Sequence, residues 1–140
     1  MFKLEVDYDF DFEVIGIVSS LKEYKLAYFI NNTLNWSFFK DSDINIPFKK
    51  GELLFSNYTY NTPNHVISLI KNKSISSKTI INKPFLLPES KEFDYLLKID
   101  GKSDEFDTSL IFDKIKEIPN IVLLKRKDIE NLINKENLIF

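Results

Sequence analysis

The sequence contains no cysteine, which excludes disulfides, thiolate metal sites and cysteine nucleophiles. Its three glycines, Gly16, Gly51 and Gly101, are too far apart to form a Gly-rich phosphate-binding loop. The single histidine, His65, cannot form a multi-histidine metal site, and no G-x-S-x-G motif accompanies it. We therefore expect no metal, no cofactor and none of the familiar hydrolase chemistries, and His65 is expected to be structural or incidental.

The sequence also lacks a strong net charge and a long apolar run. Its formal net charge of −2 gives no basic field that would attract nucleic acid, so no nucleic-acid partner is expected. No apolar stretch approaches the roughly 18 residues of a membrane helix, and charges lie where a signal peptide needs apolar residues. A cytoplasmic protein without membrane contact is the expectation. With 140 residues, 44% of them hydrophobic, residues 1–140 suit one domain with a real core.

What the sequence does contain is a long alternation at its amino terminus. From residue 2 to residue 14, apolar and charged residues alternate without a break, and only a strand places such residues on two separate faces. The segment exceeds the usual strand of about 5–6 residues, so a bend is expected near residues 8–10. The acidic face is a candidate docking face for a partner protein, or a solvated face that deters edge pairing. Its residues are Glu5, Asp7, Asp9, Asp11 and Glu13.

The same acidic residues do not form a calcium loop. Asp7, Asp9 and Asp11 have the spacing that opens an EF-hand loop. However, Phe12 occupies the position that needs glycine, and Val18 occupies the position that needs a bidentate glutamate. No metal site is predicted here.

The middle of the chain carries helix and hairpin signals. A capping box from Ser20 to Glu23 predicts a helix over residues 21–34. Its apolar surface is broader than one amphipathic face, so either the helix is nearly enclosed or part of its surface is left for a partner. Turn signals then predict two hairpins, at residues 49–52 and 61–64. The strands expected beside these turns cover residues 36–39, 44–48, 53–60 and 66–71.

The stretch around which the chain seems organised begins with Leu87-Pro88-Glu89. Pro88 has a fixed φ and favours extended backbone at Leu87, so a rigid turn should precede a central strand that ends at Asp100-Gly101. Glu89 is expected to accept hydrogen bonds from amides of the first turn, which would lower its pKa. The apolar side of the strand should contain Phe93, Tyr95, Leu97 and Ile99. Its other side should contain Asp94, Lys98 and Asp100.

The remainder of the chain predicts one more helix and one more strand. Ser103-Asp104 is expected to cap a helix over residues 106–117, and a short buried strand should follow at residues 121–124. Asp128 is expected to cap a last short helix. The apolar ending, residues 138–140, should dock on the domain.

The motif Leu87-Pro88-Glu89, followed after three residues by Phe93-Asp94-Tyr95, resembles the pattern that names the bacterial IPExxxVDY family. Leu87 stands in place of isoleucine and Phe93 in place of valine. A looser likeness extends to Ile15-Gly16-Ile17 and to the ending at residues 137–140. The resemblance implies membership over most of the chain. It implies no catalytic residue, because no activity is assigned to the family.

The order of elements predicts an α+β domain: a mostly antiparallel sheet of about five to six strands with helices packed on one face. An elaborated ferredoxin-like layout fits this order. The first functional hypothesis is a non-catalytic protein-binding or adaptor module, because the motif-based catalytic routes fail. One alternative is an enzyme that uses Glu89, Asp94 and Tyr95 for acid–base chemistry. Another is a regulatory domain that senses a small ligand. The oligomeric state stays open.

Overall fold

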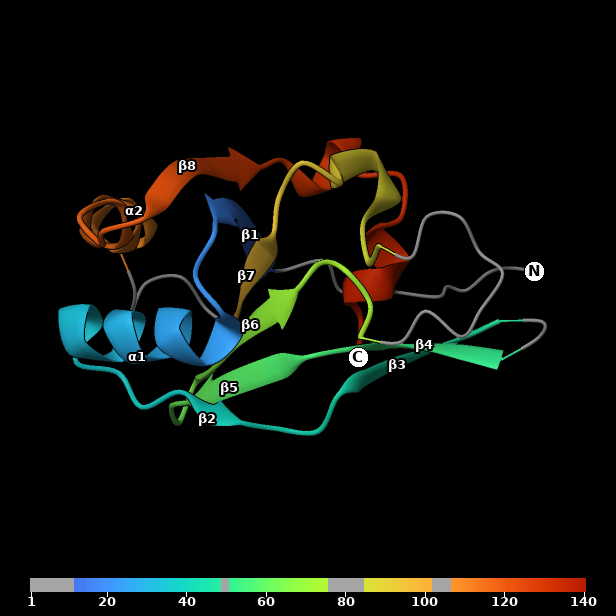
Figure 1. Cartoon of the computed structure of the whole chain (residues 1–140), viewed down its shortest axis with the longest axis horizontal. Helices are drawn as coiled ribbons and strands as arrows, with labels where there is room; N and C mark the ends of the chain where they lie inside the picture. The colour runs from blue at the N-terminus through green and yellow to red at the C-terminus, as the bar shows by residue number, and fades with distance from the viewer. Residues whose placement is uncertain (1–11, 49–50, 76–84, 102–106) are drawn as a thin grey trace.

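The computed structural model of the chain describes residues 12–48, 51–75, 85–101 and 107–140 (Figure 1). The described residues form a six-stranded antiparallel sheet, a two-stranded hairpin and two helices. The sheet contains β1 (Phe12–Ser19), β2 (Phe39–Lys40), β5 (Asn57–Asn61), β6 (His65–Lys71), β7 (Tyr95–Gly101) and β8 (Ile121–Lys127). The hairpin contains β3 (Ile44–Phe48) and β4 (Gly51–Phe55), and the helices are α1 (Glu23–Leu34) and α2 (Thr108–Lys116). The described 3-10 turns are η1 (Pro88–Ser90), η3 (Ile129–Asn131) and η4 (Lys135–Leu138).

The sheet runs in the order β2-β5-β6-β7-β1-β8, so the predicted central strand, β7, is central. Helix α1 lies in the connection between β1 and β6, two parallel strands that have β7 between them. Helix α2 connects β7 to β8 in the same way, with β1 between them. Two interleaved β-α-β units of this kind make a ferredoxin-like arrangement, which β5 and β2 extend beyond β6. The predicted α+β class with a mostly antiparallel sheet is confirmed.

Both helices cover the same face of the sheet, and Figure 1 shows α1 and α2 next to each other there. The buried sheet residues of this helix-side core are Ile15, Ile17, Ile67, Leu69, Tyr95, Leu97, Ile99 and Leu124. The helices contribute Leu26, Ala27, Ile30, Ile111 and Ile115. These positions recur every three to four residues along each helix, which places them on one stripe. Burial of each large side chain stabilises the layer by about 1.5–3 kcal/mol.

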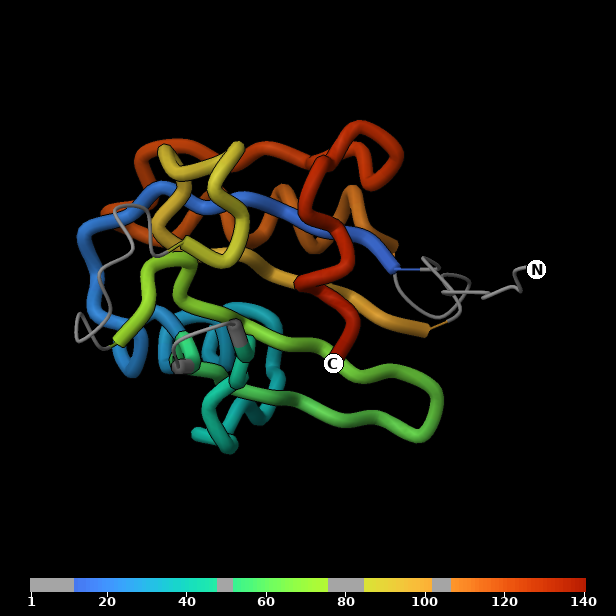
Figure 2. The backbone as a smooth tube through the Cα atoms, turned by 90° about the vertical axis from the view of Figure 1, so that its right-hand side faces the viewer, coloured from blue at the N-terminus to red at the C-terminus, as the bar shows by residue number. Residues whose placement is uncertain are grey.

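The opposite face of the sheet is buried by described segments other than the two α-helices. The sheet residues of this second core are Phe12, Val14, Ile70 and Leu96. They are covered by Ile44, Leu53 and Phe55 of the hairpin, by Leu86, Leu87 and Phe93 around η1, and by Leu132 and Leu138 near the C-terminus. Figure 2 shows the C-terminal segment crossing the strands on this side. The predicted docking of the ending is confirmed for Leu138, while Ile139 and Phe140 stay exposed.

Helix α1 begins two residues later than predicted, and the predicted capping box is wrong. The helix starts at Glu23 with Lys22 at the N-cap position and no side-chain cap. Strand β1 continues to Ser19, whose hydroxyl accepts a hydrogen bond from the amide of Leu21. The turn that leads into the helix is therefore stabilised by Ser19 and not by Ser20 as predicted. Ser19 can do so because it is the last residue of β1, which holds it beside the turn.

Two predicted strands differ in extent. Residues 53–60 are divided by the buried Ser56, so β4 and β5 belong to different sheets. Of residues 36–39, only Phe39 pairs with another strand, because the preceding aromatic side chains are drawn into the helix-side core. At residues 53–60 and again at residues 36–39, the chain thus leaves one layer of the fold and enters another.

The capping residues of the C-terminal third are partly as predicted. Helix α2 begins at Thr108, and its N-cap is Asp107, whose carboxylate accepts hydrogen bonds from two amides of the first turn. The predicted cap, Ser103-Asp104, lies outside the described residues. Asp128 caps η3, as predicted, by accepting a hydrogen bond from a backbone amide.

The two sides of β7 differ from the prediction at two residues. The residues predicted on the apolar side that do lie in the helix-side core are Tyr95, Leu97 and Ile99. Phe93 precedes β7 and packs in the second core instead, because the backbone turns before the strand begins. On the side predicted to be polar, Lys98 is only 4% exposed. The other two residues predicted there, Asp94 and Asp100, are exposed.

Candidate functional site

The segment around η1 is held by a buried amide, Asn72, directly after β6. Its Nδ2 donates to the carbonyl oxygens of Ser90 and Phe93, and its Oδ1 accepts from the amide of Leu87, all at 3.0 Å. Asn72 is fully buried. These bonds satisfy backbone groups that a buried turn would otherwise leave unpaired. Sequence reasoning missed Asn72, since an isolated asparagine after a strand carries no distinguishing pattern.

Glu89 binds the C-terminal segment. Its two carboxylate oxygens accept hydrogen bonds from the backbone amide and the side-chain amide of Asn134, both at 2.8 Å. Burial alone would raise the pKa of Glu89, but the hydrogen bonds from Asn134 outweigh burial and lower it. The predicted direction of the pKa shift is therefore supported. The strongest donors differ from the prediction, because they are the two amides of the distant residue Asn134, while the first turn contributes only the backbone amide of Glu89 itself.

Asp94 and Tyr95 fix the loop between β1 and α1. The Asp94 carboxylate accepts a hydrogen bond from the amide of Ser19 at 2.9 Å. The Tyr95 hydroxyl donates to the carbonyl oxygen of Leu21, and burial raises the pKa of this hydroxyl. Glu89, Asp94 and Tyr95 therefore each bond to a different part of the chain, and none of the described hydrogen bonds joins two of them. These contacts favour a structural role for all three.

The two parts of the chain that carry the resemblance touch each other. A Cβ atom at Gly16 would lie 2.6 Å from Cδ1 of Phe93, so only glycine leaves room for this ring. Leu87 is fully buried, and Pro88 begins η1 at its first position, where a missing amide hydrogen is harmless. Residues of the motif thus pack in the second core and form the turn η1.

Glu13 is the one residue of the predicted acidic docking face that the structure describes. Its carboxylate accepts hydrogen bonds from the Arg126 guanidinium at 2.7 Å and from the Thr108 hydroxyl at 2.9 Å. Glu13 therefore ties β8 and α2 to β1. The other residues of that face, Glu5, Asp7, Asp9 and Asp11, lie outside the described residues, as does the predicted bend at residues 8–10.

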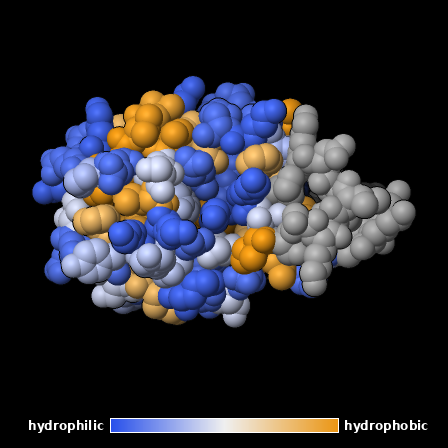
Figure 3. Space-filling view, viewed as in Figure 1, coloured by the Kyte–Doolittle hydropathy of each residue, from blue (hydrophilic) through white to orange (hydrophobic). Residues whose placement is uncertain are grey.

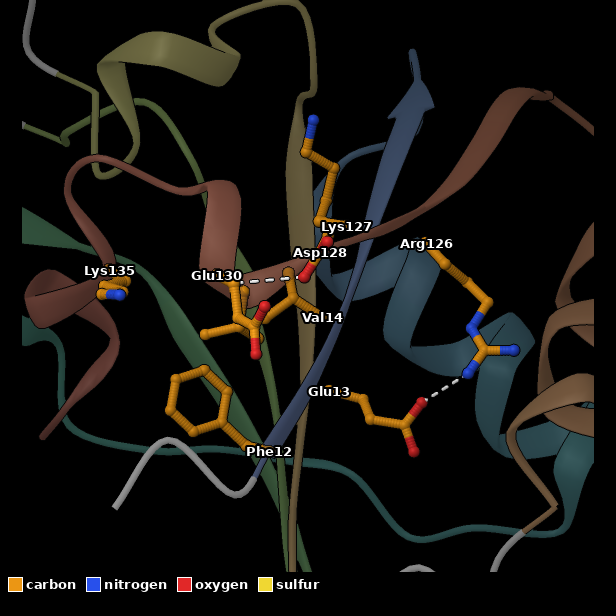
Figure 4. Close-up of a pocket in the computed structure, with 9 residues that line it drawn as sticks. Phe12, Glu13, Val14, Arg126, Lys127, Asp128, Glu130 and Lys135 are labelled. Carbon is orange, nitrogen blue, oxygen red and sulfur yellow. Dashed lines mark hydrogen bonds and ion pairs between the residues drawn. The ribbon is translucent and has the colours of Figure 1, made fainter. Parts of the chain in front are cut away.

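A hollow of about 400 Å³ lies where β8 ends beside the start of β1 (Figure 4). In this view Phe12 and Glu13 point to opposite sides of β1. The cations that line the hollow are Arg126, Lys127 and Lys135, and the carboxylates are Glu13, Asp128 and Glu130. Because three cations and three carboxylates line the hollow, their charges balance, and the hollow favours neither an anionic nor a cationic ligand.

A second hollow, of about 510 Å³, lies between Tyr95 and the start of α1. Its charged lining residues are Lys22, Lys71, Lys73, Lys91 and Asp94, and of the lysines only Lys71 is partly buried while the others are exposed. Exposed lysines are strongly hydrated, so such a ring attracts anions only weakly. Helix α1 also presents Tyr24 and Tyr28 to solvent, 54% and 59% exposed, on the broad surface that the sequence predicted.

The outer edge of β8 is the most conspicuous unpartnered feature. Strand β8 pairs with β1, and no other described residue pairs with it. Val122 is 75% exposed and Leu123 49% exposed, and Figure 3 shows an apolar patch where β8 lies in Figure 1. Lys125 and Arg126 follow, both exposed. The prediction of a short buried strand is wrong here, because several β8 residues are exposed, no described strand pairs with its outer edge, and it continues to Lys127.

The pairing of β1 with β8 contains a register shift next to Val122. Val18 pairs with Leu123 and Ser19 pairs with Ile121, which leaves Val122 as the extra residue of a β-bulge. Bulges and cations on an edge strand limit its pairing with unrelated strands. An extended segment that does fit gains main-chain hydrogen bonds along the edge and contacts with the exposed side chains.

Comparisons with known proteins do not add to this geometry. No protein-family model matches the chain, and a search of the curated proteins finds no significant match. Membership of the IPExxxVDY family therefore stays a prediction. Within the described ranges, no helix has the length and apolar character needed to cross a membrane, and no acidic or histidine cluster could hold a metal ion.

Proposed function

We propose that this protein is a non-catalytic binding module that pairs an extended acidic segment of a partner protein with the outer edge of β8. The observation that carries this proposal is an edge strand of seven residues with no described neighbour on its outer side. Most single strands in proteins are no longer than this, so the edge offers a full strand's worth of hydrogen bonds.

The exposed apolar residues at the start of β8 supply affinity. Full burial of a valine or leucine side chain contributes about 1.5–3 kcal/mol, and Val122 and Leu123 are already partly covered. Together they contribute about 2 kcal/mol, which corresponds to about thirtyfold in a dissociation constant. The remaining affinity comes from main-chain hydrogen bonds of the added strand.

The charges at the end of β8 supply selectivity. Lys125 and Arg126 are exposed on consecutive positions, with Lys127 next to them. Arg126 already pairs with Glu13, but Lys125 has no partner among the described side chains. Acidic residues on the incoming segment would face these cations, whereas a basic segment would be repelled. A partner segment that alternates apolar and acidic residues therefore fits best.

The enzyme alternative has less support. Glu89, Asp94 and Tyr95 are each engaged by separate backbone or side-chain partners, and the pKa of Glu89 is lowered. A general acid needs the opposite shift, toward the working pH. The geometry of these residues resembles a set of anchors more than a catalytic cleft.

Selection from a displayed random-peptide library tests the proposal. The wild-type chain should enrich peptides that alternate apolar and acidic residues. The variants Leu123→Lys and Lys125→Glu should each weaken binding of the selected peptides at least tenfold, which is about 1.4 kcal/mol. Matched controls on the helices, Leu110→Lys and Lys25→Glu, should bind as the wild type does. Enrichment that survives both β8 variants, or no enrichment at all, would contradict the proposal.

A further inference from the structure

A row of buried polar side chains crosses the sheet on the face opposite the helices. Thr59 of β5 pairs directly with Ser68 of β6, which pairs with Lys98 of β7. Their exposed fractions are 5%, 2% and 4%. Buried polar groups are normally hydrogen-bonded, so such a row on a sheet face needs an explanation.

Lys98 lies between two aromatic rings. Its Nζ is 4.7 Å from the ring centroid of Phe12 and 4.2 Å from that of Phe140. The nearest carboxylate oxygen, Oδ2 of Asp100, is 3.8 Å away, which is too far for a hydrogen bond. Within the described part of the chain, Asp100 is the one carboxylate that pairs with this ammonium group, which has three N–H donors and so can bind further acceptors. Burial lowers the pKa of Lys98, and Asp100 opposes that shift.

Asn57, on the same face of the sheet, has a buried hydrogen-bond acceptor without a described donor. The residue is 6% exposed, and its Oδ1 has no hydrogen-bond partner among the described residues. Its Nδ2 makes only long contacts, 3.4 Å to Thr59 Oγ1 and 3.5 Å to the carbonyl oxygen of Ser42. A buried amide oxygen without a donor costs about 1–3 kcal/mol. The face therefore contains a buried cation with one distant carboxylate partner and a buried acceptor without a donor among the described residues.

These groups line one hollow of about 260 Å³, together with Asp41 and Asp100. The hollow therefore has room for several water molecules or for one small ligand. Sites for drug-sized molecules begin at about 300 Å³, so a ligand here would be small. Lys98 and two carboxylates around one space attract opposite charges at different points.

We propose that this hollow binds a small zwitterionic amino acid. The ligand carboxylate accepts hydrogen bonds from Lys98 Nζ, with the Ser68 and Thr59 hydroxyls beside it, and the ligand ammonium donates to Asn57 Oδ1. The Asp41 carboxylate faces the same ammonium. The site lies on β5, β6 and β7, and β1 separates it from β8, so it is distinct from the edge assigned to a protein partner.

Charge explains why a zwitterion fits better than a simple ion. A lone anion would be attracted by Lys98 but repelled by Asp41 and Asp100, both of which line the hollow. A lone cation would be attracted by the carboxylates but repelled by Lys98. A small amino acid can pair its carboxylate with Lys98 and its ammonium with Asn57 at the same time. A ligand with only one of these two groups can pair with only one of the two residues.

The test is a titration of the full chain with glycine, alanine and serine, followed by calorimetry or ligand-observed NMR. Acetate and ethylamine serve as the separate halves of the ligand. At least one amino acid should bind with a dissociation constant of about 1 mM or tighter, and each half at least tenfold more weakly. Equal binding of acetate would overturn the zwitterion, and no binding at about ten times that concentration would assign the hollow to solvent.

Two variants locate the binding. Lys98→Met keeps the length of the side chain and should abolish amino-acid binding, while the exposed Lys125→Met on β8 should leave it unchanged. If Lys98→Met fails to fold, Asp41→Asn provides the test: Asp41 is only partly buried, so this variant should fold, and it should weaken binding at least tenfold. Unchanged affinity in the folded variants would refute the site. Because Lys125 belongs to β8, its variant also shows whether amino-acid binding at the hollow is independent of peptide binding at the β8 edge.

Discussion

Replacing Glu89 with glutamine should destabilise the protein by about 1–2 kcal/mol at neutral pH. Glu89 accepts two hydrogen bonds of 2.8 Å from Asn134. Each hydrogen bond to a charged group contributes about 1.5–3 kcal/mol, but Glu89 is half-buried and solvent weakens the interaction. Glutamine keeps one acceptor and presents an NH₂ group where the second acceptor was. The net loss is therefore close to one discounted charged hydrogen bond.

The same contact makes stability depend on pH in a defined direction. The pKa of Glu89 is lower in the folded chain than its ordinary value of 4.5. A group with a depressed folded pKa stabilises the fold above its unfolded pKa, and this stabilisation is lost as pH falls through the folded pKa. The difference in stability between wild type and Glu89→Gln should therefore be full near neutral pH and should shrink below about pH 4.

Urea denaturation at several pH values measures this difference, and carboxyl chemical shifts followed by NMR measure the pKa directly. Glu92→Gln is the matched control, because Glu92 is exposed on the same segment. The reasoning is refuted if Glu89→Gln is as stable as Glu92→Gln, or if the Glu89 midpoint lies above the ordinary value. A raised midpoint would instead support the acid–base alternative.

Three further predictions concern packing and the buried amide. Gly16→Ala should destabilise the fold by about 1–3 kcal/mol, and adding Phe93→Leu should recover part of the loss in chemical denaturation, since the ring is the obstacle; no recovery would place the clash elsewhere. Leu97→Ala should cost about 2–5 kcal/mol by the same assay, and a loss under about half a kcal/mol would mean that this face is exposed. Asn72→Ala should cost at least about 3 kcal/mol and increase amide exchange at Leu87; unchanged exchange there would contradict the role assigned to Asn72.

The parts of the fold that could be predicted from the sequence depend on local signals. The hairpin of β3 and β4 follows from a turn signal between two apolar runs, and the antiparallel pairing of the two strands is confirmed. The end of α1 at Leu34 and the cap at Asp128 are also local. The central position of β7 followed from its rigid first turn and its apolar side, both of which short-range patterns encode.

The parts that could not be predicted depend on residues far apart in the sequence. Phe93 lies in the second core and not on the predicted face of β7, because the turn around Asn72 fixes the backbone before the strand begins. No local sequence pattern predicts that turn. Lys98 is buried because Phe12 and Phe140 cover it from opposite ends of the chain. Glu89 finds its donor 45 residues away. The β8 edge is likewise a property of strand order, which periodicity alone does not specify.

The most direct test of the central claim is an NMR map of the peptide contact on the isotopically labelled full chain. The best peptide from the library selection is added, and backbone amide shifts and hydrogen exchange are followed for every described residue. The account predicts that the largest changes and new protection fall on Ile121–Lys127, with smaller changes in the paired strand β1. Changes centred instead on the exposed Tyr24 and Tyr28 of α1, with β8 unaffected, would contradict it.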